Sequence, residues 1–314
     1  MKALRVLRGG LLTTVQDLGR ARCRRWGVAP SGAADPFSAR LANVRAGNPQ
    51  GAAVLEMTAS GCQFEVLVPI RIALAGADMP ALGNGAPIDA RTAVELSSGD
   101  LLELGSATSG FRTYLAVSGG IDVPEVLGSR ATHLSAGFGG WNGRRLEPGD
   151  VISIFDVARA PAKEIPGSFP VPGARAELRA IPGPQMESFP AETIRQFFQE
   201  EFRVSSRSNR MGLRLEASPS GEGFSGGTAG VPEMAPEGSV AGAVQVPHGG
   251  EPIVHMPEGP VTGGYARIAA VISADLGLAG QLRPGGLVRF RETTIEEALR
   301  ALREREMMLS EGPR

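Results

Sequence analysis

One glutamine and a later glycine-containing turn are the residues of this chain best suited to bind a small amide. Gln245 stands in the largely apolar run Gly242–Pro247, where an uncharged amide is costly unless it is hydrogen-bonded. The glycine pair of Thr262-Gly263-Gly264-Tyr265 would let backbone N–H groups approach an anion or an amide closely. The intervening residues 246–261 have a length that returns a chain to a neighbouring strand. We therefore expect both segments to line one cleft, with Gln245 and Tyr265 catalytic and Thr262, Gly263 and Gly264 binding substrate.

Three arginines are further candidates. Arg210 lies within Ser208–Gly212, Arg112 begins a strand-like run, and Arg130 follows a loop of small residues. Arginine in such places either pairs with a buried carboxylate or receives an anionic substrate, and the sequence leaves both roles open. We expect Arg210 to be catalytic in the same cleft and Arg112 and Arg130 to bind substrate.

Three polar residues near the start of the chain have structural and functional interpretations. Gln16 and Asp17 stand shortly before Gly19, so they either form an Asx-type turn or act in the site. Asp35 precedes Pro36 and is most simply the N-cap of a helix.

Several classes of site are disfavoured. The only lysines are Lys2 and Lys163, and neither completes a phosphate loop of the GxxxxGK[ST] type. The G-x-S-x-G match at residues 223–227 sits in a Gly/Pro-rich loop and lacks the strand–turn–helix context of a nucleophile elbow. There is no HExxH motif, and no metal site is expected. The histidines have no helical metal-ligand spacing and are expected in core or surface roles: His133, His248 and His255.

Composition indicates a soluble globular protein. A net charge of −1 without a basic stripe argues against nucleic acid as a partner. No apolar run approaches the roughly 20 residues that a membrane span requires. Cys23 and Cys62 have neither CxxC spacing nor a disulfide-framework count, so we expect free thiols and a cytoplasmic location.

Short strands account for most of the expected elements. With 43 glycines, 24 prolines and 5% aromatic residues, many turns and few long helices are expected. Residues 64–74 place apolar side chains at every second position, which predicts one strand with a single apolar face. A turn-and-strand phrase with a central glycine recurs at 96–104, 146–154 and 282–290.

Three helices are predicted. The first follows Asp35-Pro36 and ends at Gly47-Asn48-Pro49, and the second lies near residues 190–202 with Phe197 and Phe202 on its apolar side. The third follows a capping box of Thr294 and Glu297. Its expected buried residues are Ile295, Leu299 and Leu302, before it frays in Arg-Glu-Arg-Glu.

Composition also suggests the domain boundaries. The proline-rich segment 158–174 is the expected linker, and the Gly/Pro-rich segment 217–238 is an expected long loop. The resulting prediction is a β-rich domain over 1–165, a second domain over 175–293 and a C-terminal helix over 294–309.

Several separate motifs carry a family resemblance that extends over roughly residues 3–298. They are Thr13–Arg20, Ser31–Asp35, Leu55–Thr58, Arg112–Ile121, Val126–Arg130, Asn209–Gly212, Gly242–Pro247 and Thr262–Tyr265. With these motifs the chain resembles the biotin-dependent carboxyltransferase family, often labelled allophanate hydrolase subunit 2. The resemblance implies a mainly β fold, with a cyclophilin-like β-barrel in the C-terminal half joined to a β-rich N-terminal half and few short helices.

The resemblance also implies a sister subunit of related fold, of the type known as the B subunit or as allophanate hydrolase subunit 1. Members in urea carboxylase move a carboxyl group from carboxybiotin to urea. Members in the bacterial 5-oxoprolinase open 5-oxoproline to glutamate with ATP, and one relative regulates a kinase-inhibitor protein. Glu258-Gly259-Pro260 is nearer the urea-carboxylase pattern and Gln245 nearer the stand-alone pattern, while Pro247-His248 departs from the usual Pro-Pro.

The expected function is therefore that of a subunit of an ATP-dependent 5-oxoprolinase-type amide hydrolase. The chain has neither a Met-Lys-Met biotinylation site nor an ATP-grasp domain. ATP is accordingly expected at the level of the complex, and biotin only as a group on another chain. Two alternatives remain open: a carboxyltransferase subunit acting on urea or a related amide, and a non-enzymatic regulator that binds a kinase-inhibitor protein.

Overall fold

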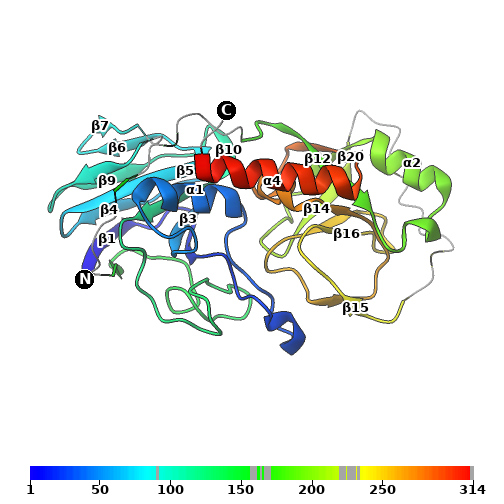
Figure 1. Ribbon diagram of the computed structural model, residues 1–314, viewed down its shortest axis with the longest axis horizontal. Helices are drawn as coiled ribbons and strands as arrows, with labels where there is room; N and C mark the ends of the chain where they lie inside the picture. Colours follow the sequence, from blue (N-terminus) through cyan, green and yellow to red (C-terminus); the bar gives the residue numbers. More distant parts are fainter. Residues whose placement is uncertain are drawn as a thin grey trace. The chain divides into compact units, whose positions relative to one another are not determined.

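The computed structural model divides the chain into two compact units (Figure 1). Unit 1 comprises residues 1–21, 31–171 and 306–314, and unit 2 comprises residues 22–30 and 172–305. The short segment 22–30 thus groups with unit 2, although the chain on both sides of it belongs to unit 1. The structure describes residues 1–89, 92–155, 161–162, 165, 171–218, 224, 231 and 234–311. Most of the expected linker, the expected long loop and the G-x-S-x-G match lie outside these residues.

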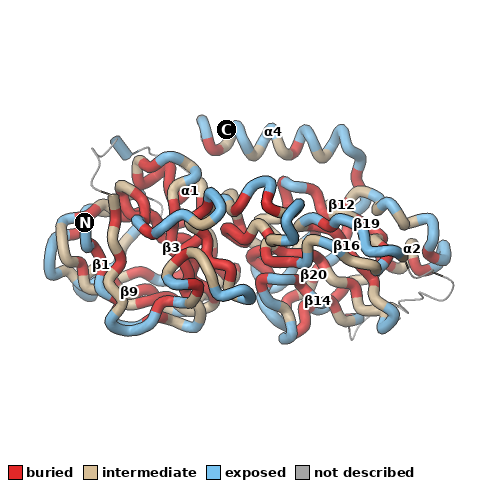
Figure 2. The backbone as a smooth tube through the Cα atoms, turned by 90° about the horizontal axis from the view of Figure 1, so that it is seen from below, coloured by how far each residue is buried: buried red, intermediate tan, exposed pale blue. Residues whose placement is uncertain are grey.

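Unit 1 is built from two antiparallel sheets packed around one apolar core. The sheets have the strand orders β11-β1-β4-β9-β6-β7 and β2-β3-β10-β5-β8. Phe64 and Leu102 of the first sheet and Leu55 and Leu115 of the second belong to that core, and Figure 2 shows the buried chain in the interior of each unit. The strands of the first sheet are Val151–Ser153 (β11), Lys2–Arg8 (β1), Gln63–Val66 (β4), Leu101–Leu104 (β9), Ala81–Gly83 (β6) and Ala86–Pro87 (β7). Those of the second are Leu12–Gln16 (β2), Val54–Thr58 (β3), Ser109–Val117 (β10), Ile70–Asp78 (β5) and Val94–Leu96 (β8).

The alternating run 64–74 forms two strands, so the prediction of a single strand was wrong. β4 ends at Val66 and β5 begins at Ile70, and the two strands lie in different sheets. Phe64 and Leu74 nevertheless reach the same core, because that core lies between the sheets. The period-two pattern therefore continues across the turn that joins them.

The outer face of the second sheet is covered by α1 (Pro36–Ala46). Asp35 caps this helix as predicted, since its Oδ1 accepts from the backbone N–H of Ser38 at 3.0 Å. Leu41 of α1 shares a cluster with Tyr114 of β10. The same sheet face therefore holds both the helix contacts and the polar residues of β3 and β10 described below.

Unit 2 contains a closed barrel of seven strands in the order β12-β19-β16-β17-β14-β13-β20. The barrel closes where β20 (Leu287–Glu292) pairs in parallel with β12 (Arg175–Pro182). This confirms the mainly β fold with a barrel in the C-terminal half. The other strands are Arg267–Val271 (β19), Ala243–Gln245 (β16), Ile253–His255 (β17), Gly212–Ala217 (β14) and Glu201–Val204 (β13). A separate two-stranded sheet is formed by Glu237–Gly238 (β15) and Thr262–Gly263 (β18).

The second predicted helix is shorter than expected. α2 covers Ala191–Gln199, and Glu200 is already in an extended conformation. Phe197 of α2 stacks on Phe290 of β20 with ring centroids 4.5 Å apart. Phe202 was assigned to the same helix, but it lies in β13 and joins this aromatic group from the strand. Aromatic packing, not helical spacing, is what brings it to Phe197.

The third predicted helix begins as expected and continues further. In α4 (Ile295–Glu311) the Glu297 N–H donates to Thr294 Oγ1 at 3.2 Å, which confirms the capping box. Ile295 and Leu299 were predicted to be buried but are 61% and 48% exposed. The helix also continues through 303–306, where fraying was predicted. The remaining short helices are Cys23–Trp26 (η1), Met186–Ser188 (η2), Ser273–Asp275 (η3) and Leu276–Gly280 (α3).

The recurring turn-and-strand phrase is confirmed at all three places. Gly99, Gly149 and Gly285 each have a positive φ, and β9, β11 and β20 follow them. In the described part of the chain, no helix is both long enough and apolar enough to span a membrane.

Candidate functional site

Both polar atoms of the Gln245 side chain are hydrogen-bonded within unit 2. The residue ends β16 and is 4% exposed. Its Oε1 lies 2.8 Å from Nε2 of His255, and its Nε2 donates to the carbonyl of Tyr265 at 3.2 Å. Because the amide nitrogen donates to a carbonyl, the amide oxygen is the atom that faces the imidazole. The partners that a buried amide requires are therefore present.

His255 of β17 links Gln245 to a serine. An amide oxygen can only accept, so Nε2 of the imidazole carries the hydrogen. The other nitrogen, Nδ1, lies 2.8 Å from Oγ of Ser239 and therefore accepts the hydroxyl hydrogen. The donors run in one direction, from Ser239 through His255 and Gln245 to the Tyr265 carbonyl.

The imidazole of His255 is neutral at pH 7. Burial, followed by the nearby charges of Arg24 and Arg267, lowers the pKa of His255 from 6.5 to about 4. Ser239, His255 and Gln245 are each at most 4% exposed. We call these three residues the polar relay.

The glycine turn lies directly against the polar relay. A Cβ atom on Gly263 would stand 2.6 Å from Nε2 of Gln245, so only glycine permits this approach. The residue pairs with Glu237 in the β15–β18 ladder. The structure thus brings Gln245, Gly263 and the Tyr265 backbone together.

The two ends of the turn face outwards. Thr262 is exposed, and Tyr265 is 46% exposed. The Tyr265 ring stands edge-on to His248 with centroids 5.9 Å apart. A Cβ on Gly264 would lie 3.0 Å from the carbonyl oxygen of Met234. The accessible groups of the turn are therefore its hydroxyl-bearing ends.

Two arginines that were not predicted stand beside the relay. Nη1 of Arg24, in η1, donates to the carbonyl of Ser239 at 2.6 Å. Nη1 of Arg267, in β19, donates to the carbonyl of Gly238 at 2.7 Å, and its Nη2 pairs with Glu237. Both cations disfavour a charged His255.

Arg210 is used in a buried ion pair. Its Nε lies 2.6 Å from Oε1 of Glu258, and the two side chains are 4% and 2% exposed. The Glu258 N–H also donates to the Arg210 carbonyl at 3.0 Å. The structure therefore places Arg210 in a neutralised pair next to β14 and β17, with no hydrogen bond between it and Gln245 or the glycine turn among the described contacts.

Arg112 and Arg130 lie in unit 1. Nε of the buried Arg112 is 3.7 Å from Oε1 of Glu56. Nη1 of Arg130 pairs with Glu125 at 2.5 Å, and its Nε donates to the carbonyl of Val123 at 3.0 Å. Each of these arginines therefore has a carboxylate close by within its own unit.

Asp17 forms the Asx-type turn that the sequence allowed. Its Oδ1 accepts from the Gly19 N–H and from Oγ of Ser129, each at 2.7 Å. Its Oδ2 accepts from the backbone N–H of Arg130 at 2.6 Å. Gln16 is fully buried, and its Nε2 donates to Oγ1 of Thr14 at 3.0 Å and to the carbonyl of Thr132 at 3.3 Å. Both residues hold backbone segments of unit 1 together.

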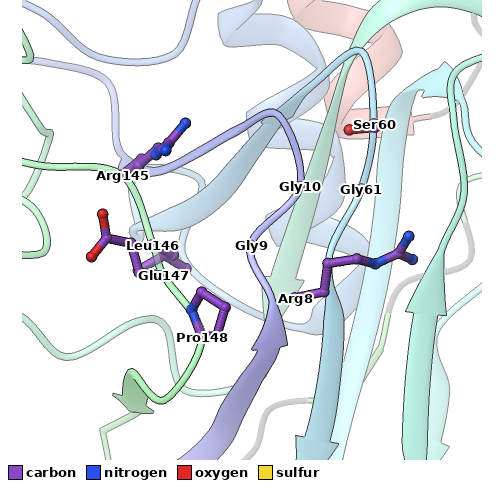
Figure 3. Close-up of a pocket in the computed structure, with 9 residues that line it drawn as sticks. All are labelled: Arg8, Gly9, Gly10, Ser60, Gly61, Arg145, Leu146, Glu147 and Pro148. Carbon is purple, nitrogen blue, oxygen red and sulfur yellow. The ribbon is translucent and has the colours of Figure 1, made fainter.

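Unit 1 also has a pocket of about 340 Å³ (Figure 3). Its glycines have packing reasons, since a Cβ on Gly9 would lie 2.4 Å from the Leu146 carbonyl oxygen. Arg8 pairs with Glu103 at 3.2 Å, and Nη1 of Arg145 donates to the Leu11 carbonyl at 3.3 Å. None of the predicted site residues lines it. The lining residues are Arg8, Gly9, Gly10, Ser60, Gly61, Arg145, Leu146, Glu147 and Pro148.

Sequence reasoning missed Ser239, His255 and Arg24. His255 was expected in a core or surface role, and only its contact with Gln245 shows that it belongs to the relay. Arg24 lies 215 positions before the serine whose carbonyl it binds. No local pattern marks such a contact, because only folding brings η1 to the residue that follows β15. Among the described residues, no group of three His, Cys, Asp or Glu side chains could hold a metal ion.

Comparisons with known proteins identify relatives of this chain. A family model described as carboxyltransferase domain, subdomain A and B, matches residues 26–292. The C subunit of the 5-oxoprolinase of Escherichia coli (strain K12) is 36% identical over 308 residues, which cover 96% of this chain and 95% of the relative.

Proteins that act on urea are similar as well. The urea amidolyase of Lachancea kluyveri is 35% identical over 327 residues, which cover 96% of this chain but 17% of the relative. The solved structure of the Kluyveromyces lactis urea carboxylase superposes with a TM-score of 0.87 and 32% identity, over 98% of this chain and 29% of the other.

Proposed function

This chain belongs to the family of carboxyltransferase domains with subdomains A and B, and on that basis we propose that it is a subunit of an ATP-dependent complex that opens 5-oxoproline to glutamate. The observation that carries this proposal is the 36% identity to the C subunit of a 5-oxoprolinase, which covers nearly all of both chains. A second 5-oxoprolinase C subunit, from Haemophilus influenzae, is 32% identical over 95% of this chain and 94% of the relative.

The geometry of unit 2 is consistent with a small planar amide. In the proposal the lactam lies against the exposed ends of the turn Thr262–Tyr265, with the Tyr265 hydroxyl and backbone donors toward its carbonyl. Gln245, with His255 and Ser239, lies below this turn and holds it in place by hydrogen bonds. Gln245 therefore acts as a positioning residue.

ATP is assigned to the complex as a whole. In the assembled complex ATP would supply the activation of the lactam oxygen, so that water could add to the ring carbonyl and the C–N bond of the ring could break, with ADP and phosphate as the other products. The residues of this chain bind the lactam, orient its carbonyl and stabilise the charge that develops on the oxygen. Arg112 and Arg130, in unit 1, remain proposed substrate contacts of the assembled complex.

A carboxyltransferase role is the second candidate. It is favoured by the superposition on urea carboxylase, with a TM-score of 0.87 over 98% of this chain. Glu258-Gly259-Pro260 is also nearer the urea-carboxylase pattern than the stand-alone pattern. In this case biotin would be a group on another chain, and urea or a related amide would take the position of the lactam.

The proposal requires a partner subunit. We assign a sister subunit of the B-subunit type, because relatives are named as a subunit of 5-oxoprolinase and as urea-metabolising proteins several times longer than this chain. Co-expression should give a hetero-oligomer on size exclusion, whereas strictly separate elution at micromolar concentration would contradict it. The two cysteines are free thiols, which is consistent with the proposed cytoplasmic location.

In the deciding experiment, the chain is purified and combined with its sister subunits. Glutamate should form from 5-oxoproline only when ATP and all subunits are present. A matched reaction should contain urea, bicarbonate, ATP and a biotin carrier with its carboxylase. Carboxylation of urea without any glutamate from 5-oxoproline would reject the lactamase proposal in favour of the second candidate.

A further inference from the structure

Arg24 differs from the other arginines of the unit 2 site in having no carboxylate beside it. Arg267 is paired with Glu237, and Arg210 is paired with Glu258. Arg24 bonds the Ser239 carbonyl and forms no ion pair in the part of the chain that the structure describes. Its side chain is half-buried, and this burial lowers its pKa. A partly desolvated cation without a counter-charge attracts an anion.

The loop that carries Arg24 is closed at its base. The Ala33 N–H donates to the Asp17 carbonyl at 2.8 Å, which joins the chain before and after segment 22–30. Asp17 Oδ1 also accepts from the Gly19 N–H at 2.7 Å. A Cβ on Gly32 would lie 2.7 Å from the Gly19 nitrogen, so the two chain segments at the base of the loop are in contact. The loop therefore leaves and re-enters unit 1 at one point.

The base of the loop is fixed to the second sheet by a buried carboxylate. Oε2 of Glu56 accepts from the Ala34 N–H at 2.8 Å and from the Tyr114 hydroxyl at 2.9 Å. The Tyr114 hydroxyl in turn accepts from the Asp35 N–H at 2.7 Å. Glu56 and Tyr114 are at most 1% exposed. These bonds hold Ala34 and Asp35 to strands β3 and β10.

We propose that Arg24 binds the carboxylate of the substrate. The inference rests on the proposed function for the identity of that substrate. One Nη1 hydrogen is used on the Ser239 carbonyl, and the Nε–Nη2 edge of the guanidinium has the fork that matches a carboxylate. The substrate class is then a cyclic amide that carries a carboxylate next to its ring nitrogen, and not a neutral amide.

The bound carboxylate would also act on the polar relay. Arg24 is one of two cations that oppose protonation of His255, the other being Arg267, which is neutralised by Glu237. Burial is the larger cause of the lowered His255 pKa and stays, but an anion on Arg24 offsets the contribution of that cation and raises the affinity of His255 for a proton. Substrate binding is thereby coupled to the hydrogen-bond chain under the glycine turn.

Equilibrium binding to the reconstituted complex without ATP tests the proposal directly. The probes are 5-oxoproline and 2-pyrrolidinone, the same lactam without the carboxylate. Arg24→Gln should weaken 5-oxoproline binding by about tenfold or more and leave 2-pyrrolidinone binding unchanged. Arg24→Lys should recover part of the loss, and the matched control Arg25→Gln, at an exposed residue against the Trp26 ring, should behave as wild type.

The outcomes separate this inference from the proposed function. Equal affinity of wild type and Arg24→Gln for 5-oxoproline would overturn the inference even if turnover is found, and so would absence of binding to wild type at millimolar ligand. Arg24-dependent binding without any glutamate formation would overturn the proposed function alone. A loss of 2-pyrrolidinone binding equal to that of 5-oxoproline would overturn the inference too, because it would show damage to the site and not loss of a carboxylate contact.

Discussion

Oε1 of Gln245 lies 2.8 Å from Nε2 of His255, and this contact fixes the state of the whole polar relay. Because the amide oxygen can only accept, the imidazole is held as the tautomer with hydrogen on Nε2. The Ser239 hydroxyl must then donate to Nδ1. One glutamine thus decides the direction of a hydrogen-bond chain that ends beneath the glycine turn.

Replacement of Gln245 by Leu should disable the site and lower stability moderately. The change leaves the Nε2–H of His255 and the Tyr265 carbonyl without partners, at a cost of about 1–3 kcal/mol in the free energy of unfolding. Denaturant melts and turnover in the reconstituted complex measure the two effects. Gln199→Leu, on the exposed side of α2, is the control and should stay within about 0.5 kcal/mol of wild type. Full activity per folded molecule of Gln245→Leu would show that Gln245 serves stability alone.

Stability should fall in acid because His255 is buried as a neutral imidazole. Its pKa is lowered from 6.5 to about 4, so the unfolded chain takes up a proton that the folded chain refuses. The contribution of the neutral His255 to the free energy of unfolding is fully present above pH 6.5 and is lost as the pH falls toward 4. This loss amounts to about 3 kcal/mol.

Urea denaturation of wild type and His255→Gln at pH 7 and pH 4.5 checks this. The variant should lose less stability than wild type between the two pH values. His248→Gln, at an exposed position, should keep the wild-type difference. An identical pH dependence of His255→Gln and wild type would contradict the assignment of a buried neutral imidazole.

The Arg210–Glu258 pair should prove structural. Arg210→Met leaves the Glu258 carboxylate buried without its partner, which is expected to cost about 3–5 kcal/mol. The double variant Arg210→Met with Glu258→Leu should regain much of this, because both buried charges are then absent. Thermal melts of the three proteins measure the effect. If folded Arg210→Met retains its stability but loses turnover, Arg210 is catalytic as the sequence predicted.

A methyl group at position 263 should disturb the relay. In Gly263→Ala the new Cβ would stand 2.6 Å from Nε2 of Gln245, so the amide must move away from the Tyr265 carbonyl. We expect a loss of about 1–3 kcal/mol in stability together with reduced turnover. Gly238→Ala is the matched control on the paired strand, because its Cβ would meet nothing within 4 Å. Equal behaviour of the two variants would argue against a tight fit at the relay.

Local signals predicted much of the fold. The Asp35 cap, the Thr294–Glu297 capping box and the glycine turns depend on neighbouring residues, and each is found where the sequence indicates it. The errors arise where distant contacts compete with local pattern. Phe202 continues a helical spacing but lies in a strand. In α4, Ile295 and Leu299 are exposed, although their spacing is that of an apolar helix face.

The sequence by itself determined the mainly β composition, the helix caps, the family and the need of Gln245 for hydrogen-bond partners, because these depend on short-range chemistry or on whole motifs. Only the tertiary structure decided which partners those are. His255 reaches the site through the pairing of β16 with β17, Ser239 follows the β15–β18 ladder, and Arg24 comes from segment 22–30. Contacts that join such distant positions leave no periodic trace in the chain. The roles of the arginines were likewise decided by the carboxylates that folding places beside them: Glu258 neutralises Arg210, while Arg24 is left with its charge uncompensated at the relay, within the part of the chain that the structure describes.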